Sequence, residues 1–143
     1  MRHALAPGVG DPPNFKVNDC STQRNLNDEG RAQASEMGQW LQRREIKILR
    51  VESSRWCRAK ETAKLLNLGT VRPNKNLDSL FEEPDLLNHP QTANIKKRIQ
   101  SHRNTRGLLV FVDTSLTFKQ SPESHSIPVK ASSSKQRLQE NSK

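Results

Sequence analysis

The first three residues of the chain place an arginine directly before a histidine, as Arg2 and His3. A neutral imidazole can attack phosphorus and hold the phosphoryl group covalently, which divides one difficult displacement into two easier ones. A guanidinium can stabilise the charge on phosphoryl oxygens through bidentate hydrogen bonds. The pair therefore indicates either a nucleophile beside a phosphate ligand or an exposed histidine in a basic sequence.

Two further segments carry arginines in a defined context. The first is QRNLNDEGRAQA (23–34), which contains Arg24, and the second is SSRWCRAKETA (53–63), which contains Arg58. Arg58 falls in the first turn of a predicted helix, where anions bind favourably, so a phosphate ligand is the better interpretation there. Arg24 lies in a predicted loop, and its interpretation as a phosphate contact or a surface arginine stays open.

Together with RHA (2–4), these segments resemble the histidine phosphatase superfamily, the phosphoglycerate-mutase-like enzymes. The resemblance covers about residues 1–112 and is greatest to the small, single-domain, phosphohistidine-phosphatase-like branch. It implies a catalytic set of His3 as nucleophile with Arg2 and Arg58, and a phosphate-binding set of Arg2, Arg24 and Arg58. The implied activity is hydrolysis of phosphomonoesters or phosphoamidates without metal or cofactor, on a small phosphorylated substrate or a phosphoprotein.

The chain departs from this family at the position of the acid–base groups. The family places a second catalytic histidine after the strand that matches LLVFV, whereas this chain reads Asp113-Thr114. In the segment LDSLFEE, Ser79 stands nearest the expected acidic residue, and Glu82 and Glu83 are the remaining acid–base candidates. The alternative function is therefore an inactive or truncated family member that at most binds phosphate-like anions.

Helical and extended patterns alternate along the chain. Asn27 is a good N-cap for a helix with an inner face of Ala34, Met37, Trp40 and Leu41. Strands are predicted at 46–51 and 107–112, and further helices after Ser54 and over 91–103. This order predicts an α/β three-layer sandwich with a mostly parallel sheet, an incomplete phosphoglycerate-mutase-like fold. Ligands of such sheets bind beyond the carboxyl ends of the strands.

The last part of the chain has a different composition. Residues 113–143 are rich in Ser and Lys and lack hydrophobic periodicity, so we predict a partial phosphatase domain over 1–112 followed by a disordered tail. No strand-length segment precedes Arg2, and the pattern stops abruptly after Val112. These two features predict truncation at both ends, with a shifted reading frame or a rearranged end as the cause of the second.

Charge and composition limit the class of partner. The net charge is +9 and hydrophobic residues make up 31% of the chain, which favours anionic partners. Nucleic acid is disfavoured, because only two Trp and four Phe could stack on bases. No segment is long and apolar enough for a membrane span. Cys20 and Cys57 form no disulfide framework, which predicts a reducing, cytoplasmic location; a signal peptide before Met1 is the alternative. The oligomeric state is left open.

Overall fold

The computed structural model describes residues 1–114, and the predicted tail lies outside this part from residue 115 onward. Helices and strands alternate along the described chain, as the sequence predicts. In order they are η1 (Cys20–Thr22), α1 (Asp28–Gln42), β1 (Ile48–Ser53), α2 (Cys57–Leu65), β2 (Val71–Pro73), η2 (Lys75–Leu77), α3 (Pro90–Ser101) and β3 (Leu108–Val112).

The three strands form a parallel sheet in the order β2-β1-β3. Val51 of β1 pairs with Val71 on one side and with Val110 on the other. A parallel bridge between Arg2 and Asp113 continues the pairing beyond the end of β3. The arginine–histidine pair therefore lies at the carboxyl edge of the sheet, where a ligand is expected.

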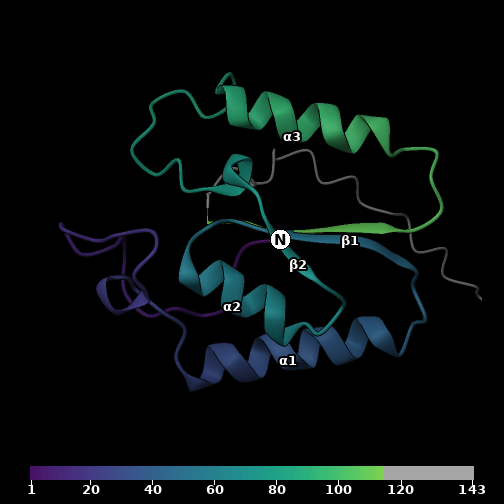
Figure 1. Cartoon of the computed structure of the whole chain (residues 1–143), viewed down its shortest axis with the longest axis horizontal. Coiled ribbons are helices and arrows are strands. Elements are labelled where there is room, and N and C mark those ends of the chain that lie inside the picture. The colour runs from purple at the N-terminus through teal and green to yellow at the C-terminus, as the bar shows by residue number, and fades with distance from the viewer. Residues whose placement is uncertain (115–143) are drawn as a thin grey trace, which may run out of the picture.

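Helices cover both faces of the sheet, with α1 and α2 below the strands and α3 above them in Figure 1. The larger core lies between the sheet and α2 and consists of Val51, Ala59, Ala63, Leu66, Val110 and Val112. A smaller cluster of Leu77, Ile95 and Phe111 joins α3 to the other face. The predicted α/β three-layer arrangement with a parallel sheet is confirmed.

The inner face of α1 differs from the predicted one. Its buried residues are Gly30, Ala34 and Gly38, whereas Met37 and Trp40 are 42% and 44% exposed. A Cβ atom at Gly38 would lie 2.1 Å from the carbonyl oxygen of Leu66, so small residues are required for the close approach of α1 to α2. The helical period was predicted correctly, but the large side chains lie outside the contact.

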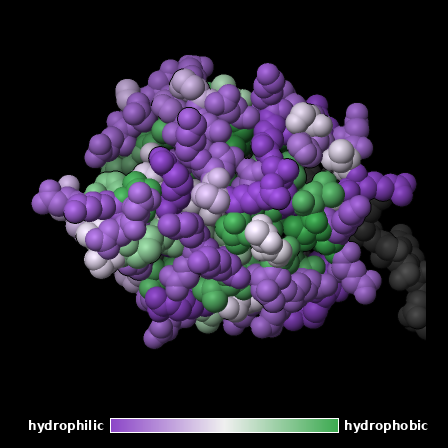
Figure 2. All heavy atoms as spheres, in the orientation of Figure 1, coloured by the Kyte–Doolittle hydropathy of each residue, from purple (hydrophilic) through white to green (hydrophobic). Residues whose placement is uncertain are grey.

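The surface in Figure 2 is mainly hydrophilic, with separate hydrophobic patches between charged side chains. Among the described residues, no helix has the length and apolar character needed to cross a membrane.

Candidate active site

A pocket of about 540 Å³ opens at the carboxyl end of the strands. Its wall includes all three predicted phosphate ligands, Arg2, Arg24 and Arg58, together with Glu82 and Glu83. The loops over 5–26 and 79–89 lie on the left in Figure 1, α2 supplies Arg58, and Arg2 lies next to the N-terminus at the centre of the view. Segments far apart in the sequence thus form one cavity lined by three arginines and three carboxylates, those of Asp11, Glu82 and Glu83.

His3 lies behind this wall, not in it. Its side chain is buried, and Arg58, which does line the pocket, donates from Nε to His3 Nε2 at 3.2 Å. On the opposite side of the ring, Nδ1 lies 2.7 Å from the carbonyl oxygen of Ala4. A carbonyl oxygen can only accept, so Nδ1 carries the proton and Nε2 presents a lone pair. This is the tautomer required of a nucleophile that attacks through Nε2.

The surroundings of His3 keep its ring neutral. The pKa of His3 is lowered to about 4, mainly by burial and also by the positive charges of Arg58, Arg2 and Arg24, while the hydrogen bond to Ala4 acts in the opposite direction. At neutral pH the imidazole is therefore unprotonated and able to act as a nucleophile.

Arg58 is almost fully buried and is held by an ion pair with Asp11. Its Nη1 donates to Asp11 Oδ1 at 2.7 Å, and its Nη2 donates to Asp11 Oδ2 at 3.0 Å. Thr62, one turn further along α2, donates to the Arg58 carbonyl oxygen and accepts from the backbone of Ala4. The guanidinium is thus held between two residues, with Nε bound to His3 and the two Nη atoms bound to Asp11.

Asp11 lies outside the segments that the sequence singles out, in a stretch of Gly and Pro, and was not predicted as a site residue. Its carboxylate also accepts from Trp56 Nε1 at 2.9 Å and from the Arg24 backbone at 3.1 Å. Burial acts to raise the pKa of Asp11, but these hydrogen bonds and the charge of Arg58 outweigh burial and lower it. The signal that could have indicated it is charge: clustered, buried arginines need a nearby carboxylate as a counter-charge.

Two nitrogens of the Arg24 guanidinium are already bound to backbone carbonyl oxygens, so Arg24 is not a free phosphate ligand. Its Nε donates to the Gly10 carbonyl oxygen at 2.8 Å, and its Nη1 donates to the Ala6 carbonyl oxygen. Burial and the neighbouring charge of Arg58 lower its pKa. Arg24 therefore holds the 6–11 loop while it also contributes to the pocket wall.

The segment after β3 brings two polar residues into the site region. Thr114 lines the pocket, and its hydroxyl lies 3.1 Å from Ser54 Oγ. Asp113 is 3% exposed, and neither carboxylate oxygen has a hydrogen-bond partner among the described residues. Burial raises the pKa of Asp113 to about 6, an effect opposed by the N-terminal amine and by Arg2.

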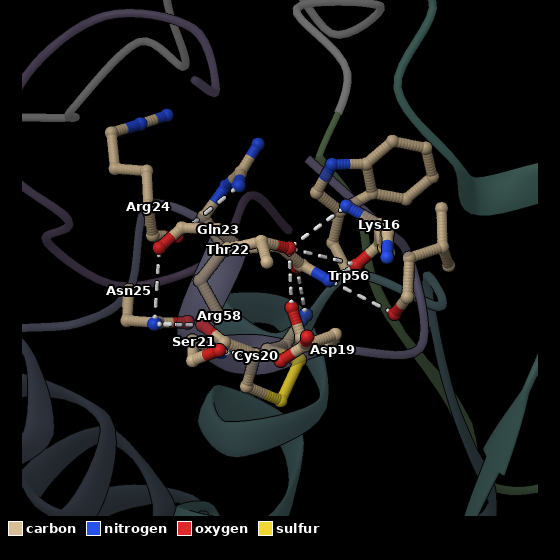
Figure 3. Close-up of a disulfide and its surroundings, with 12 residues drawn as sticks. Lys16, Asp19, Cys20, Ser21, Thr22, Gln23, Arg24, Asn25, Trp56 and Arg58 are labelled. Atoms are coloured by element: carbon tan, nitrogen blue, oxygen red, sulfur yellow. Dashed lines mark hydrogen bonds between the residues drawn. A yellow bond between two sulfur atoms is a disulfide. The ribbon is translucent and has the colours of Figure 1, made fainter. Parts of the chain in front are cut away.

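A disulfide joins Cys20 of η1 to Cys57, the first residue of α2, and lies directly beside Arg58 (Figure 3). Between the two cysteines, Gln23 accepts from the Cys57 backbone at 2.9 Å. The expectation of unpaired cysteines is wrong, because the fold brings residues 37 positions apart to a Cα separation of 5.6 Å. The pair was missed because two cysteines give no spacing pattern.

The described residues include no group of three or more His, Cys, Asp or Glu side chains arranged to hold a metal ion. The expectations that the protein needs neither a metal nor a cofactor stay predictions.

The family model described as the histidine phosphatase superfamily (branch 1) matches residues 16–102, more than half of the chain. None of the curated proteins compared with the sequence matches it.

Three solved structures share the fold. The protein histidine phosphatase SixA complexed with tungstate is 20% identical with a TM-score of 0.55, over 81% of this chain and 67% of that one. A putative phosphohistidine phosphatase SixA from Nakamurella multipartitia is 21% identical with a TM-score of 0.53, over 82% and 58%. That from Agrobacterium tumefaciens is 17% identical with a TM-score of 0.56, over 82% and 68%. The chain thus spans between 58% and 68% of their lengths.

The protonation of His3 can be measured directly. Because its pKa is lowered from 6.5 to about 4, NMR of the imidazole nitrogens should show a neutral, Nδ1-protonated ring at pH 5.5. The unfolded chain binds the proton more readily, so His3 contributes stability that is lost as pH falls from about 6.5 to about 4. The raised pKa of Asp113 changes the free energy of unfolding in the opposite direction over part of this range. The NMR signal of His3 is identified by its absence in His3→Asn. A His3 ring that titrates near 6.5 would contradict this arrangement.

The disulfide should stabilise the fold. It closes a long loop, so replacing both cysteines in a Cys20→Ser, Cys57→Ser variant should lower the free energy of unfolding by about 2–4 kcal/mol in a denaturant titration. As a matched control, a reductant should lower the unfolding midpoint of the native protein to that of the variant and leave the variant unchanged. A native midpoint that does not respond to the reductant would show that the cysteines are not paired.

Proposed function

The chain belongs to the histidine phosphatase superfamily, branch 1, and on that premise we propose that it hydrolyses phosphomonoesters or phosphoamidates through a phosphohistidine at His3. Arg2, Arg24 and Arg58 bind the phosphoryl oxygens. A small phosphorylated molecule or a phosphoprotein is the substrate class, and nucleic acid is not expected as a partner. The bound tungstate of one fold relative is in keeping with a site for tetrahedral oxyanions.

One observation carries the proposal: the Nε2 lone pair of His3 is directed to Arg58, which lines a pocket that also contains two further arginines. The proton on the other nitrogen of the ring is held by Ala4. A candidate nucleophile of fixed orientation therefore lies directly behind the wall of the cavity that holds the cationic ligands for the transferred group.

The reaction begins when a phosphate group enters the pocket and Arg58 turns from His3 to the phosphoryl oxygens. The freed Nε2 lone pair forms the N–P bond as the bond from phosphorus to the leaving atom breaks, and the leaving atom takes the electron pair and then a proton. The Nδ1–H group stays on Ala4 and stabilises the positive charge that develops on the ring. In the second step water attacks phosphorus, a proton goes to solvent, and Nε2 recovers its electron pair as phosphate leaves.

Glu82 and Glu83 are the acid–base candidates in this proposal, and either carboxylate can pass a proton from solvent to the leaving group. Both are exposed in the wall of the pocket that holds the arginines, so either can reach a group that leaves toward the opening. Thr114, which follows the strand where the family has its second histidine, is no acid at neutral pH.

A second candidate function is binding of phosphate-like anions without turnover. It is favoured by the Asp11 carboxylate, which already occupies two nitrogens of Arg58. A phosphate dianion must displace this carboxylate or share the guanidinium with it before Nε2 is free. If that exchange does not occur, an anion can lie on Arg2 and Arg24 while His3 stays covered.

The cytoplasmic location stays a prediction, and the structure weakens its basis. The prediction rested in part on unpaired cysteines, whereas Cys20 and Cys57 are joined. Stable disulfides are typical of oxidising compartments. The location therefore has to be measured on the protein in its own cell.

Oxyanion binding tests the proposed arginine set. Vanadate or phosphate should raise the unfolding temperature of the native protein by mass action, and Arg58→Ala should abolish this shift. Arg72→Ala removes the same charge from an exposed position outside the pocket and should retain it.

Turnover of a chromogenic phosphate ester then separates the two candidate functions. Hydrolysis that disappears in His3→Ala supports the enzyme, whereas oxyanion protection without hydrolysis supports the anion-binding protein. Protection that persists unchanged in Arg58→Ala would refute the assignment of this residue as a phosphate ligand.

A further inference from the structure

The pocket is much larger than the phosphate group that its arginines would bind. Its volume is about 540 Å³, whereas one water in the liquid takes about 30 Å³ and a phosphate group fills only a few such volumes. Cavities of this size hold whole small organic molecules. The residues of the remaining wall should therefore match the chemistry of the organic group that the substrate carries on its phosphate.

This remaining wall is largely apolar. Two loops supply its apolar members, which are Val9, Pro12, Pro13, Phe15, Leu80 and Phe81. Val9 is 87% exposed and Phe81 is 61% exposed, which is unusual for large apolar side chains grouped at one opening. An apolar group bound beside the arginines would remove both side chains from water.

Aromatic contacts extend from the arginines toward this wall. The indole of Trp56 is anchored by Asp11, which also binds Arg58. Phe15 packs on the same indole with ring centroids 5.6 Å apart and an interplanar angle of 40°. A flat ring on the phosphate would meet an aromatic surface of fixed orientation, and such ring pairs are favourable.

We infer that the substrate is a small aryl phosphate monoester, whose phosphate lies on the arginines and whose ring lies against the apolar wall. The inference rests on the proposed function and names its leaving group. Glu82 and Glu83 at the same opening disfavour a second anionic group on the substrate, because like charges repel.

The chemistry of the site suits such a leaving group. When His3 Nε2 attacks, the bond from phosphorus to the phenolic oxygen breaks and its electron pair stays on that oxygen, which then takes a proton from solvent. A phenol has a pKa of about 10 and is far more acidic than an aliphatic alcohol, so an aryl oxide leaves with little help from an acid. A threonine in place of a catalytic histidine is therefore tolerated for aryl esters more readily than for alkyl esters.

Two matched, non-hydrolysable ligands test this inference without requiring turnover. Phenylphosphonate and methylphosphonate carry the same anionic group and differ in the ring. Calorimetric titration of the native protein should give an affinity about tenfold higher for phenylphosphonate, because only the ring buries apolar surface. Phe81→Ser should bring the two affinities close together. Leu87→Ser, which replaces an apolar residue that is 69% exposed and lies outside the pocket, should keep the tenfold ratio.

Arg58→Ala separates failure of this inference from failure of the proposed function. If it loses both ligands but the native protein binds them equally, or if Phe81→Ser keeps the tenfold ratio, the aryl inference is overturned and the phosphate site stands. If Arg58→Ala binds both ligands as the native protein does, or if the native protein binds neither, the proposed phosphate site fails and the inference fails with it.

Discussion

The buried guanidinium of Arg58 is the group on which the site depends. A charge with 3% exposure is tolerated only when its donors are paired, and here the partners are Asp11, the Arg24 carbonyl oxygen and the neutral ring of His3. These partners come from the first residues, the following loop and the segment before α1. Neutralising one cation therefore determines where three separate parts of the chain lie, and it places His3, the proposed nucleophile, against the pocket wall.

The proposed reaction requires this ion pair to be exchanged. Asp11 satisfies Arg58, and Arg58 in turn donates to Nε2 of His3, the proposed attacking nitrogen. A phosphate offers Arg58 the same bidentate geometry with greater charge, so its binding can exchange one partner for the other and uncover the nitrogen. Around this exchange the frame stays fixed, since the Cys20–Cys57 disulfide and the Gln23 contact tie the loop to the start of α2.

Much of this arrangement could be predicted from the sequence, and the parts that could not share a physical cause. The order of helices and strands, the N-cap Asn27 and the convergence of Arg2 and Arg58 follow from local patterns and from the topology of parallel sheets. Asp11 and the disulfide depend on loop paths, which no periodicity encodes. The inner face of α1 was missed because hydrophobicity was given more weight than the space available beside Leu66. Local signals predicted the elements, whereas charge balance and close packing determined the contacts.

The central claim is that Nε2 of His3 receives the phosphoryl group. It is tested most directly by rapid quenching of the native protein during reaction with an aryl phosphate that carries the radiolabel on its phosphoryl group. Peptide mapping then locates the label. The account predicts an acid-labile, alkali-stable label on the peptide that contains His3, and no label in His3→Ala. Turnover with the label on another residue, or turnover that survives in His3→Ala, would contradict it.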